Sequence, residues 1–352
     1  MTIAEPAPVD DVPQRAKPRR ARRTFGVIAM IVVGAILAGA VWIALNPQRV
    51  TDQLAVWSFK PSAALEGYVD RSLFTDEGRF LFFASQPVIA PEGEFDDVCA
   101  SRSEDVGILG CYLPNEQTIF LYDVTDARLD GLEEAVAAHE LLHAVWDRMS
   151  QADRDALAPY LEAEVTARAD DEDLAQTLAF YAENEPAERL NELHSIVATE
   201  FDEIAPELEA HYAKYFVDRS VIAALHEKSN AVFEEQARAI TELVAQIDEI
   251  AASIDEDYAT YNSGYDELNA DIDNFNARAD SGDFSSQAQF NAERAELLQR
   301  QANLDALYSS IEARVAQYDD LVAQLDDLNA VLAGLNESIN ITPRADSNLG
   351  EN

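Results

Sequence analysis

The chain has 352 residues, of which 25 are lysine or arginine and 66 are aspartate or glutamate, so its formal net charge is -41. This excess of negative charge repels polyanions, which excludes nucleic acid or an anionic membrane surface as the main ligand. We assign the acidity instead to a solvated surface that keeps the protein from associating non-specifically.

A membrane anchor is predicted near the N-terminus. An uninterrupted apolar run from Phe25 to Leu45 has about the 20 residues that a helix needs to cross the hydrocarbon core. The basic residues that precede it predict, by the positive-inside rule, a cytoplasmic tail at 1–23, a transmembrane helix at 24–45 and an extracytoplasmic remainder. The alternative is a cleaved signal peptide with Ala38-Gly39-Ala40 as its cleavage site, although the apolar region of a signal is usually shorter.

Residues 46–225 are predicted to form a mixed domain. The segment from Ala63 to Phe74 is typical of a short helix, whereas residues 79–83 and 118–122 are aromatic and β-branched runs, bounded by Gly, Pro or Asp, that are typical of strands. We expect the run from Ile119 to Tyr122 either to lie at the edge of a substrate cleft, where it can hold an extended peptide, or to be an ordinary core strand.

Cys99 and Cys111 both lie in the predicted extracytoplasmic part. An even pair of cysteines in an oxidising compartment predicts a disulfide, which would close the loop that contains Gly107 and Gly110. In the chain-entropy model a bridge of this span stabilises the fold by about 3 kcal/mol. Two free buried thiols are the alternative.

The most informative stretch is Glu133–Arg148, with His139-Glu140-Leu141-Leu142-His143 at its centre. Positions four apart share one face of a helix, so both imidazoles can bind one metal ion while Glu140 lies beside them. A catalytic zinc takes three protein ligands, and the carboxylate after the first histidine is the usual general base. The surrounding helix is apolar, which disfavours three buried polar side chains without a metal; histidines that are merely hydrogen-bonded in a core are the alternative.

The pattern His139-Glu140-Leu141-x-His143-Ala144-Val145-x-Asp147 resembles the active-site helix of thermolysin-like peptidases and, more broadly, the gluzincin group of zinc peptidases. In that group the third ligand is a glutamate from a later helix, often within an Asn-Glu-x-x-Ser-Asp motif. This chain has Asn191-Glu192-Leu193-His194-Ser195, followed by Ile196 instead of the aspartate. The resemblance implies a zincin-like catalytic domain with Zn2+ on His139, His143 and Glu192.

The residues themselves leave the third ligand open. Glu200 lies two helical turns after Glu192 and could share its face, and the imidazole of His194 also suits zinc. Asp147 is expected either to hydrogen-bond the other ring nitrogen of His143 or to face solvent.

Beyond Trp146 the sequence predicts helices at 152–167, 173–181 and 187–216, the last with a break at Pro206. His211 and Tyr212 are candidate donors to the oxyanion of a tetrahedral intermediate. The alternative for the histidine is a purely structural role.

Residues 226–340 repeat apolar side chains at intervals of three and four, which is typical of a coiled-coil seam. The break at 278–286 predicts that two helices fold back as an antiparallel coiled-coil hairpin, before a disordered tail at 341–352. A helix of about 50 residues spans roughly 75 Å. We expect the hairpin to set the distance to a protein partner, to dimerise the protein or to present Phe284 at its tip; a stalk without a ligand is the alternative.

Together these elements predict an α+β protein that is mostly α: a single N-terminal transmembrane helix, a zincin-like domain with a small β-sheet, and the helical hairpin. The expected function is that of a membrane-anchored extracytoplasmic zinc metallopeptidase acting on a peptide or protein substrate, with Glu140 as general base. The alternative is a catalytically inactive zincin-like surface scaffold that acts through the hairpin. Glu140 favours the enzyme, because a purely structural site has no use for a base.

Overall fold

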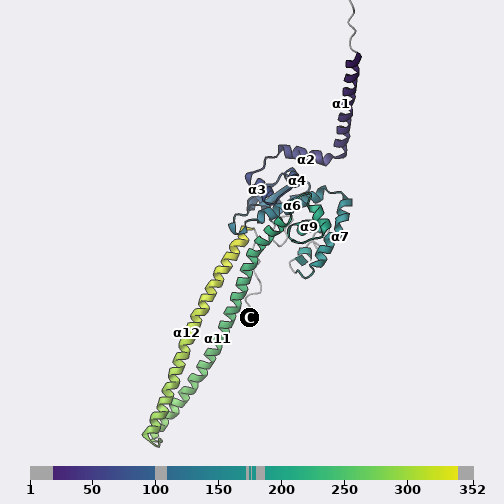
Figure 1. Ribbon diagram of the computed structural model, residues 1–352. Coiled ribbons are helices and arrows are strands. Elements are labelled where there is room, and N and C mark those ends of the chain that lie inside the picture. The colour runs from purple at the N-terminus through teal and green to yellow at the C-terminus, as the bar shows by residue number, and fades with distance from the viewer. Residues whose placement is uncertain (1–18, 100–108, 172–173, 176, 180–186, 340–352) are drawn as a thin grey trace, which may run out of the picture. The chain divides into compact units, whose positions relative to one another are not determined.

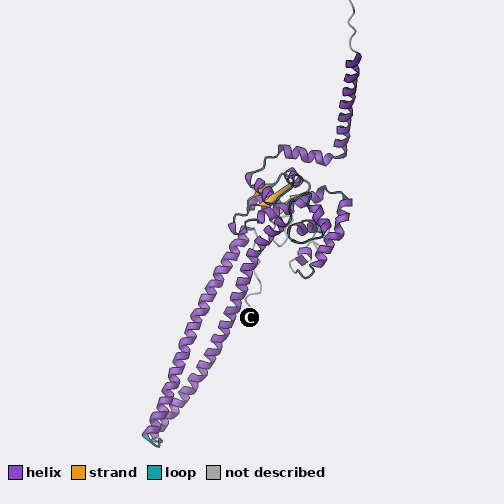
Figure 2. Cartoon of the chain, viewed as in Figure 1, coloured by secondary structure: helices purple, strands orange, loops and turns teal. Residues whose placement is uncertain are grey.

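The computed structural model describes residues 19–99, 109–171, 174–175, 177–179 and 187–339, and it is mostly helical with one three-stranded sheet (Figure 1, Figure 2). This composition confirms the expected α+β class. The chain divides into two units, Met1–Phe59 and Lys60–Asn352. The predicted tail at 341–352 lies outside the described residues.

The first unit contains helix α1 (Arg19–Leu45) and helix α2 (Pro47–Ser58). Asn46 separates them, and its side-chain amide donates a hydrogen bond to the carbonyl of Trp42. By length and hydropathy, no single helix of the described residues qualifies as a membrane span; Met30–Leu45 and α2 pass that test only as a pair, bent by 94°. The predicted single span at 24–45 therefore stays a prediction.

The second unit carries all the other elements. In chain order they are α3 (Ala63–Arg71), α4 (Asp76–Ala84), β1 (Val88–Ala90), α5 (Glu92–Cys99), β2 (Gly110–Leu113), β3 (Thr118–Tyr122), the 3-10 helix η2 (Ala127–Leu129), α6 (Leu132–Arg148), α7 (Gln151–Ala167), α9 (Arg189–Thr199), α10 (Pro206–Tyr212), α11 (Ser220–Ser281) and α12 (Gln287–Ser338).

The sheet has the order β1-β3-β2, with β1 parallel and β2 antiparallel to β3. The strand predicted at 118–122 is confirmed as β3, and of its two expected roles the structure supports the ordinary core strand. It is the central strand, with Ile119 and Leu121 buried. The two outer strands are β1 and β2, and in β2 Gly110 pairs with Leu121. Sequence pattern alone does not rank strands within a sheet, because the ranking depends on long-range pairing.

The strand predicted at 79–83 is also wrong, because these residues lie in helix α4. The Thr75 side chain caps this helix by accepting a hydrogen bond from the Gly78 backbone at 3.1 Å, and two acidic residues follow in the first turn. Both features stabilise a helix N-terminus. Phe82 is then fully buried against Phe74, with ring centroids 5.5 Å apart. Capping and tertiary burial thus override the strand preference of an aromatic run.

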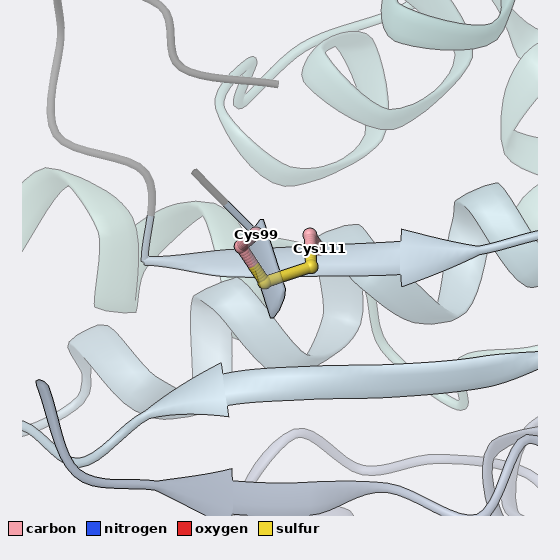
Figure 3. Close-up of a disulfide and its surroundings, with 2 residues drawn as sticks. All are labelled: Cys99 and Cys111. Carbon is pink, nitrogen blue, oxygen red and sulfur yellow. A yellow bond between two sulfur atoms is a disulfide. The ribbon is translucent and has the colours of Figure 1, made fainter. Parts of the chain in front are cut away.

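The predicted disulfide is confirmed: Cys99, at the end of α5, is bonded to Cys111 of β2 (Figure 3). Both cysteines are buried in an apolar cluster with Ala90, Phe95 and Tyr122. The bridge therefore ties α5 to the strand that lies nearest the candidate site.

The helices after α6 follow the prediction with one correction. The helix expected at 152–167 is α7, whereas the helix expected at 187–216 is divided into α9 and α10. Pro206 does not interrupt a helix but begins α10, because the first turn needs no backbone N–H donor there. The helix expected at 173–181 falls partly outside the described residues.

The helical hairpin is formed by α11 and α12, which lie side by side in Figure 1. Its turn falls in the predicted break, where Gly282 adopts the left-handed conformation, with φ of 78°, that ends a helix. The ion pairs Arg278–Glu293, Arg300–Asp271 and Arg314–Asp257 recur at steps of 7 and then 14 residues on both helices. The two helices therefore keep one heptad register.

At the turn of the hairpin, Phe284 packs on Phe275 and Phe290, with ring centroids 5.2 Å from each. The Phe284 ring therefore contributes to packing within the turn of the hairpin. At the other end, Leu335 and Ile339 are buried with Leu129 and Leu132, at the start of α6.

Candidate metal centre

Helix α6 forms the floor of the candidate site. It starts after Gly131, whose φ of 106° is suited to glycine, and carries two acidic residues in its first turn. Most of the helix is buried, with Leu141, Leu142 and Ala144 fully inaccessible. A helix packed on so many sides holds its polar side chains in fixed positions.

Three side chains meet at one point, as the sequence predicted. The Nε2 atom of His139 lies 3.7 Å from Oε2 of Glu192, and Nε2 of His143 lies 3.5 Å from Oε1 of the same carboxylate. One candidate ligand atom from each residue falls within 4.8 Å of the others. His139, His143 and Glu192 can therefore hold a metal ion, and Glu192, the first choice for the third ligand, is the acidic residue that joins the pair.

The electrostatics of this triad favour a cation. Burial lowers the pKa of His139, but the carboxylates around it, above all Glu192, outweigh this effect and raise the pKa to about 9. The carboxylates thus hold a proton on a ring that burial alone would keep neutral. The same negative charges would stabilise a bound metal cation.

Helix α9 orients both imidazoles through their other ring nitrogen. Asn191, Ser195 and Thr199 are spaced by four and share one face. Nδ1 of His143 lies 3.0 Å from Oδ1 of Asn191 and 3.4 Å from the Ser195 hydroxyl, while Nδ1 of His139 lies 3.5 Å from the Thr199 hydroxyl. These contacts place the hydrogen on Nδ1 of His143 and leave Nε2 to face Glu192.

Of the two positions expected for Asp147, the structure shows the solvent-facing one, because its side chain is exposed. The carboxylate of Asp147 accepts a hydrogen bond from the Tyr112 hydroxyl of β2 at 2.9 Å. The residue that contacts Nδ1 of His143 is Asn191. The spacing of four residues puts Asp147 on the correct face, but the ring of His143 turns its Nδ1 toward α9. Sequence reasoning missed Asn191, although its spacing of four from Ser195 was the available signal.

The reserve ligand His194 points away from the centre, because it follows Glu192 by two residues and so lies on the far side of α9. Its Nε2 atom is 2.9 Å from Nε2 of His211, and its ring packs on Trp146. Burial lowers the pKa of His194 well below its ordinary value and lowers the pKa of His211 to about 4. This pair is a neutral core contact.

The proposed oxyanion donors are likewise placed elsewhere. The Tyr212 hydroxyl is fully buried and donates to the carbonyl oxygen of His194 at 2.8 Å. His211 faces His194. Both belong to the packing between α9 and α10, which agrees with the structural role given as the alternative for His211.

Glu140 lies between α6 and the sheet and is only 5% exposed. A Cβ atom at Gly110 of β2 would come within 2.7 Å of Cγ and Oε1 of Glu140 and of Cγ1 of Val136. The glycine therefore leaves the room that this carboxylate occupies. Strand β2 thus packs directly on Glu140, the residue that follows the first histidine.

Glu200, the other reserve ligand, lies outside the triad. Its carboxylate is 4.0 Å from Nε2 of His226, a residue of α11 that the sequence reading did not use. Desolvation and the nearby carboxylates of Asp171 and Glu192 raise the pKa of Glu200 to about 7, against the opposing effect of His139, while 34% of its side chain stays exposed. No local motif marks His226; only the packing of α11 brings it here.

Comparisons with protein-family models, with curated proteins and with solved structures find no match to this chain.

Proposed function

We propose that this chain is a zinc-dependent metallopeptidase. The observation that carries the proposal is the convergence of His139, His143 and Glu192, with Glu140 adjacent. Zinc bonds of about 2.0 to 2.1 Å in a tetrahedron separate neighbouring ligand atoms by about 3.3 to 3.4 Å. The Nε2 to carboxylate distances of 3.5 and 3.7 Å are close to that separation, so the donor set and its spacing both suit zinc.

When bound in such a site, zinc supplies Lewis acidity, which lowers the pKa of water and polarises a carbonyl oxygen. Glu140 takes the proton from the attacking water and delivers it to the amine nitrogen that leaves as the peptide bond breaks. Asn191 and Ser195 hold the ring of His143 in position. Gly110 leaves the space in which the Glu140 side chain acts.

Strand β2 is the element best placed to hold the substrate. It is one of the two outer strands of the sheet, the other being β1, and it lies against α6. An extended peptide can add to such an edge through backbone hydrogen bonds, which select for a chain conformation more than for particular side chains. This role is one of the two alternatives that we expected for β3 from its sequence.

We also propose that the N-terminal unit anchors the protein in a membrane, with the second unit on the extracytoplasmic side. The support is the apolar run at 25–45, the basic residues before it and the disulfide between Cys99 and Cys111, which forms in oxidising compartments. Extraction of the expressed chain from membranes by detergent but not by alkaline carbonate is the expected result; release by carbonate would contradict the anchor.

The test of the enzyme is Glu140→Gln, which keeps the size of the side chain but removes its basicity. We expect the variant to retain one zinc per chain by elemental analysis and to lose at least a hundredfold of peptide hydrolysis. Glu116→Gln, an exposed change of the same kind, is the matched control. An unchanged rate in Glu140→Gln would reject the mechanism, whereas a zinc-loaded wild-type protein without hydrolysis would favour the scaffold.

A further inference from the structure

Glu200 borders the candidate metal centre at the C-terminal end of α9. The preceding residue, Thr199, has its hydroxyl 3.5 Å from Nδ1 of His139. The charge of Glu200 is also one of the causes that raise the pKa of His139. Its side chain is 34% exposed, so the carboxylate is accessible to solvent.

Two other carboxylates of this domain lie beside an arginine. Glu134 lies 2.8 Å from Arg71, and Glu209 lies 2.7 Å from Arg219. Within the described part of the chain, no lysine or arginine forms an ion pair with Glu200.

The neighbour of Glu200 is a neutral imidazole. The amide nitrogen of Asn230, which can only donate, lies 3.3 Å from Nε2 of His226, so that ring nitrogen is an acceptor. Burial lowers the pKa of His226 to about 4, which agrees with a ring that carries no charge. His226 is therefore an uncharged neighbour, 4.0 Å from the Glu200 carboxylate, and does not cancel its charge.

We propose that Glu200 is a specificity residue that binds a cationic group of the peptide substrate beside the metal centre. This inference rests on the proposed peptidase function and names its substrate class. Burial and the carboxylates of Asp171 and Glu192 raise the pKa of Glu200 to about 7, and a cation beside it would favour the ionised form. An ammonium or guanidinium group would then form a charge-assisted hydrogen bond with the carboxylate. The cation has two sources, a lysine or arginine side chain and the free α-amino group of the peptide, which would make the enzyme an aminopeptidase.

The experiment compares kcat/KM of the full-length zinc-loaded protein on N-acetylated decapeptides in which one lysine is moved along a neutral sequence. A matched set carries norleucine instead of lysine. We expect a 10- to 100-fold preference for lysine at one position relative to the cleaved bond, and we expect Glu200→Gln to reduce that preference to less than threefold. A third set with a free N-terminus and no lysine tests the α-amino source: cleavage next to the terminus, lost on acetylation, assigns the cation to it.

Glu207→Gln is the matched control, because it removes an exposed carboxylate of α10 and should leave the lysine preference as in wild type. Equal rates for lysine, norleucine and free-amine peptides would overturn the proposal while leaving the peptidase intact. If no peptide is cleaved, the proposed function fails, and calorimetric binding of the same peptides to Glu140→Gln still decides the inference. Equal affinities for the lysine, norleucine and free-amine sets would then overturn it.

Discussion

Replacing Asn191 by alanine is expected to weaken zinc binding without unfolding the protein. The amide oxygen of Asn191 lies 3.0 Å from Nδ1 of His143, and the hydroxyl of Ser195 lies 3.4 Å from the same atom. Loss of a partner that orients a metal-binding histidine typically costs 10- to 100-fold in affinity. Because Ser195 remains as a longer substitute, we expect about tenfold, or about 1.4 kcal/mol, for Asn191→Ala.

Removing both partners of His143 should bring the loss of zinc affinity to about 100-fold. In Asn191→Ala/Ser195→Ala the Nδ1 atom loses both contacts, and the expected loss is about 100-fold, or about 2.7 kcal/mol. Asn191→Asp keeps the acceptor and should bind zinc at least as tightly as wild type. Alanine is favourable within a helix, so the fold of α9 should persist.

The assay is competition for zinc against a chromophoric chelator at neutral pH, with circular dichroism to verify the helix content. Asn303→Ala, an exposed change on α12, serves as the control. A zinc dissociation constant within twofold of wild type for the double variant would refute the assigned role of these side chains, and with it the geometry of the centre.

Three further predictions follow from the same contacts. Because the pKa of His139 is raised from 6.5 to about 9 in the metal-free protein, its proton stabilises that form fully below pH 6.5 and is lost as the pH rises through about 9. Zinc must displace this proton, so its affinity should rise about tenfold per pH unit up to about pH 9; a pH-independent affinity measured by competition would contradict this. Gly110→Ala would place a Cβ atom 2.7 Å from the Glu140 side chain, so we expect at least tenfold slower hydrolysis with unchanged zinc content, and a normal rate would disprove the close packing. Replacing Cys99 and Cys111 by serine removes a cross-link over 12 residues and should cost about 3 kcal/mol in the free energy of unfolding measured in urea; a loss below about 1 kcal/mol would argue against the chain-entropy estimate.

The part of the site that the sequence predicted is the part with local periodicity. His139 and His143 are four residues apart in a segment whose apolar pattern is helical. Glu192 belongs to a short segment that resembles a known ligand motif. Each of these inferences needs only one element. For the same reason the heptads of α11 and α12 and the position of their turn were predicted correctly.

The rest depends on which elements meet. Asp147 and Asn191 were equally suitable partners for His143 by residue type, and only the packing of α9 on α6 selects the asparagine. His226 comes to the centre from the first turns of a helix that otherwise belongs to the hairpin. The order of β1, β2 and β3 likewise comes from long-range pairing, for which a single sequence holds no local signal.

The hairpin leaves and re-enters the domain through one buried cluster that includes Leu132 and Leu335. Its ion pairs repeat at multiples of seven residues. Removing or adding seven residues in each helix would therefore keep the remaining residues of α11 opposite their present partners on α12. Each such exchange alters the reach by about 10 Å while every residue around His139 keeps its neighbours. The length of the hairpin can therefore change without altering the metal centre. We expect each helix of the hairpin to differ in length by multiples of seven residues between related chains.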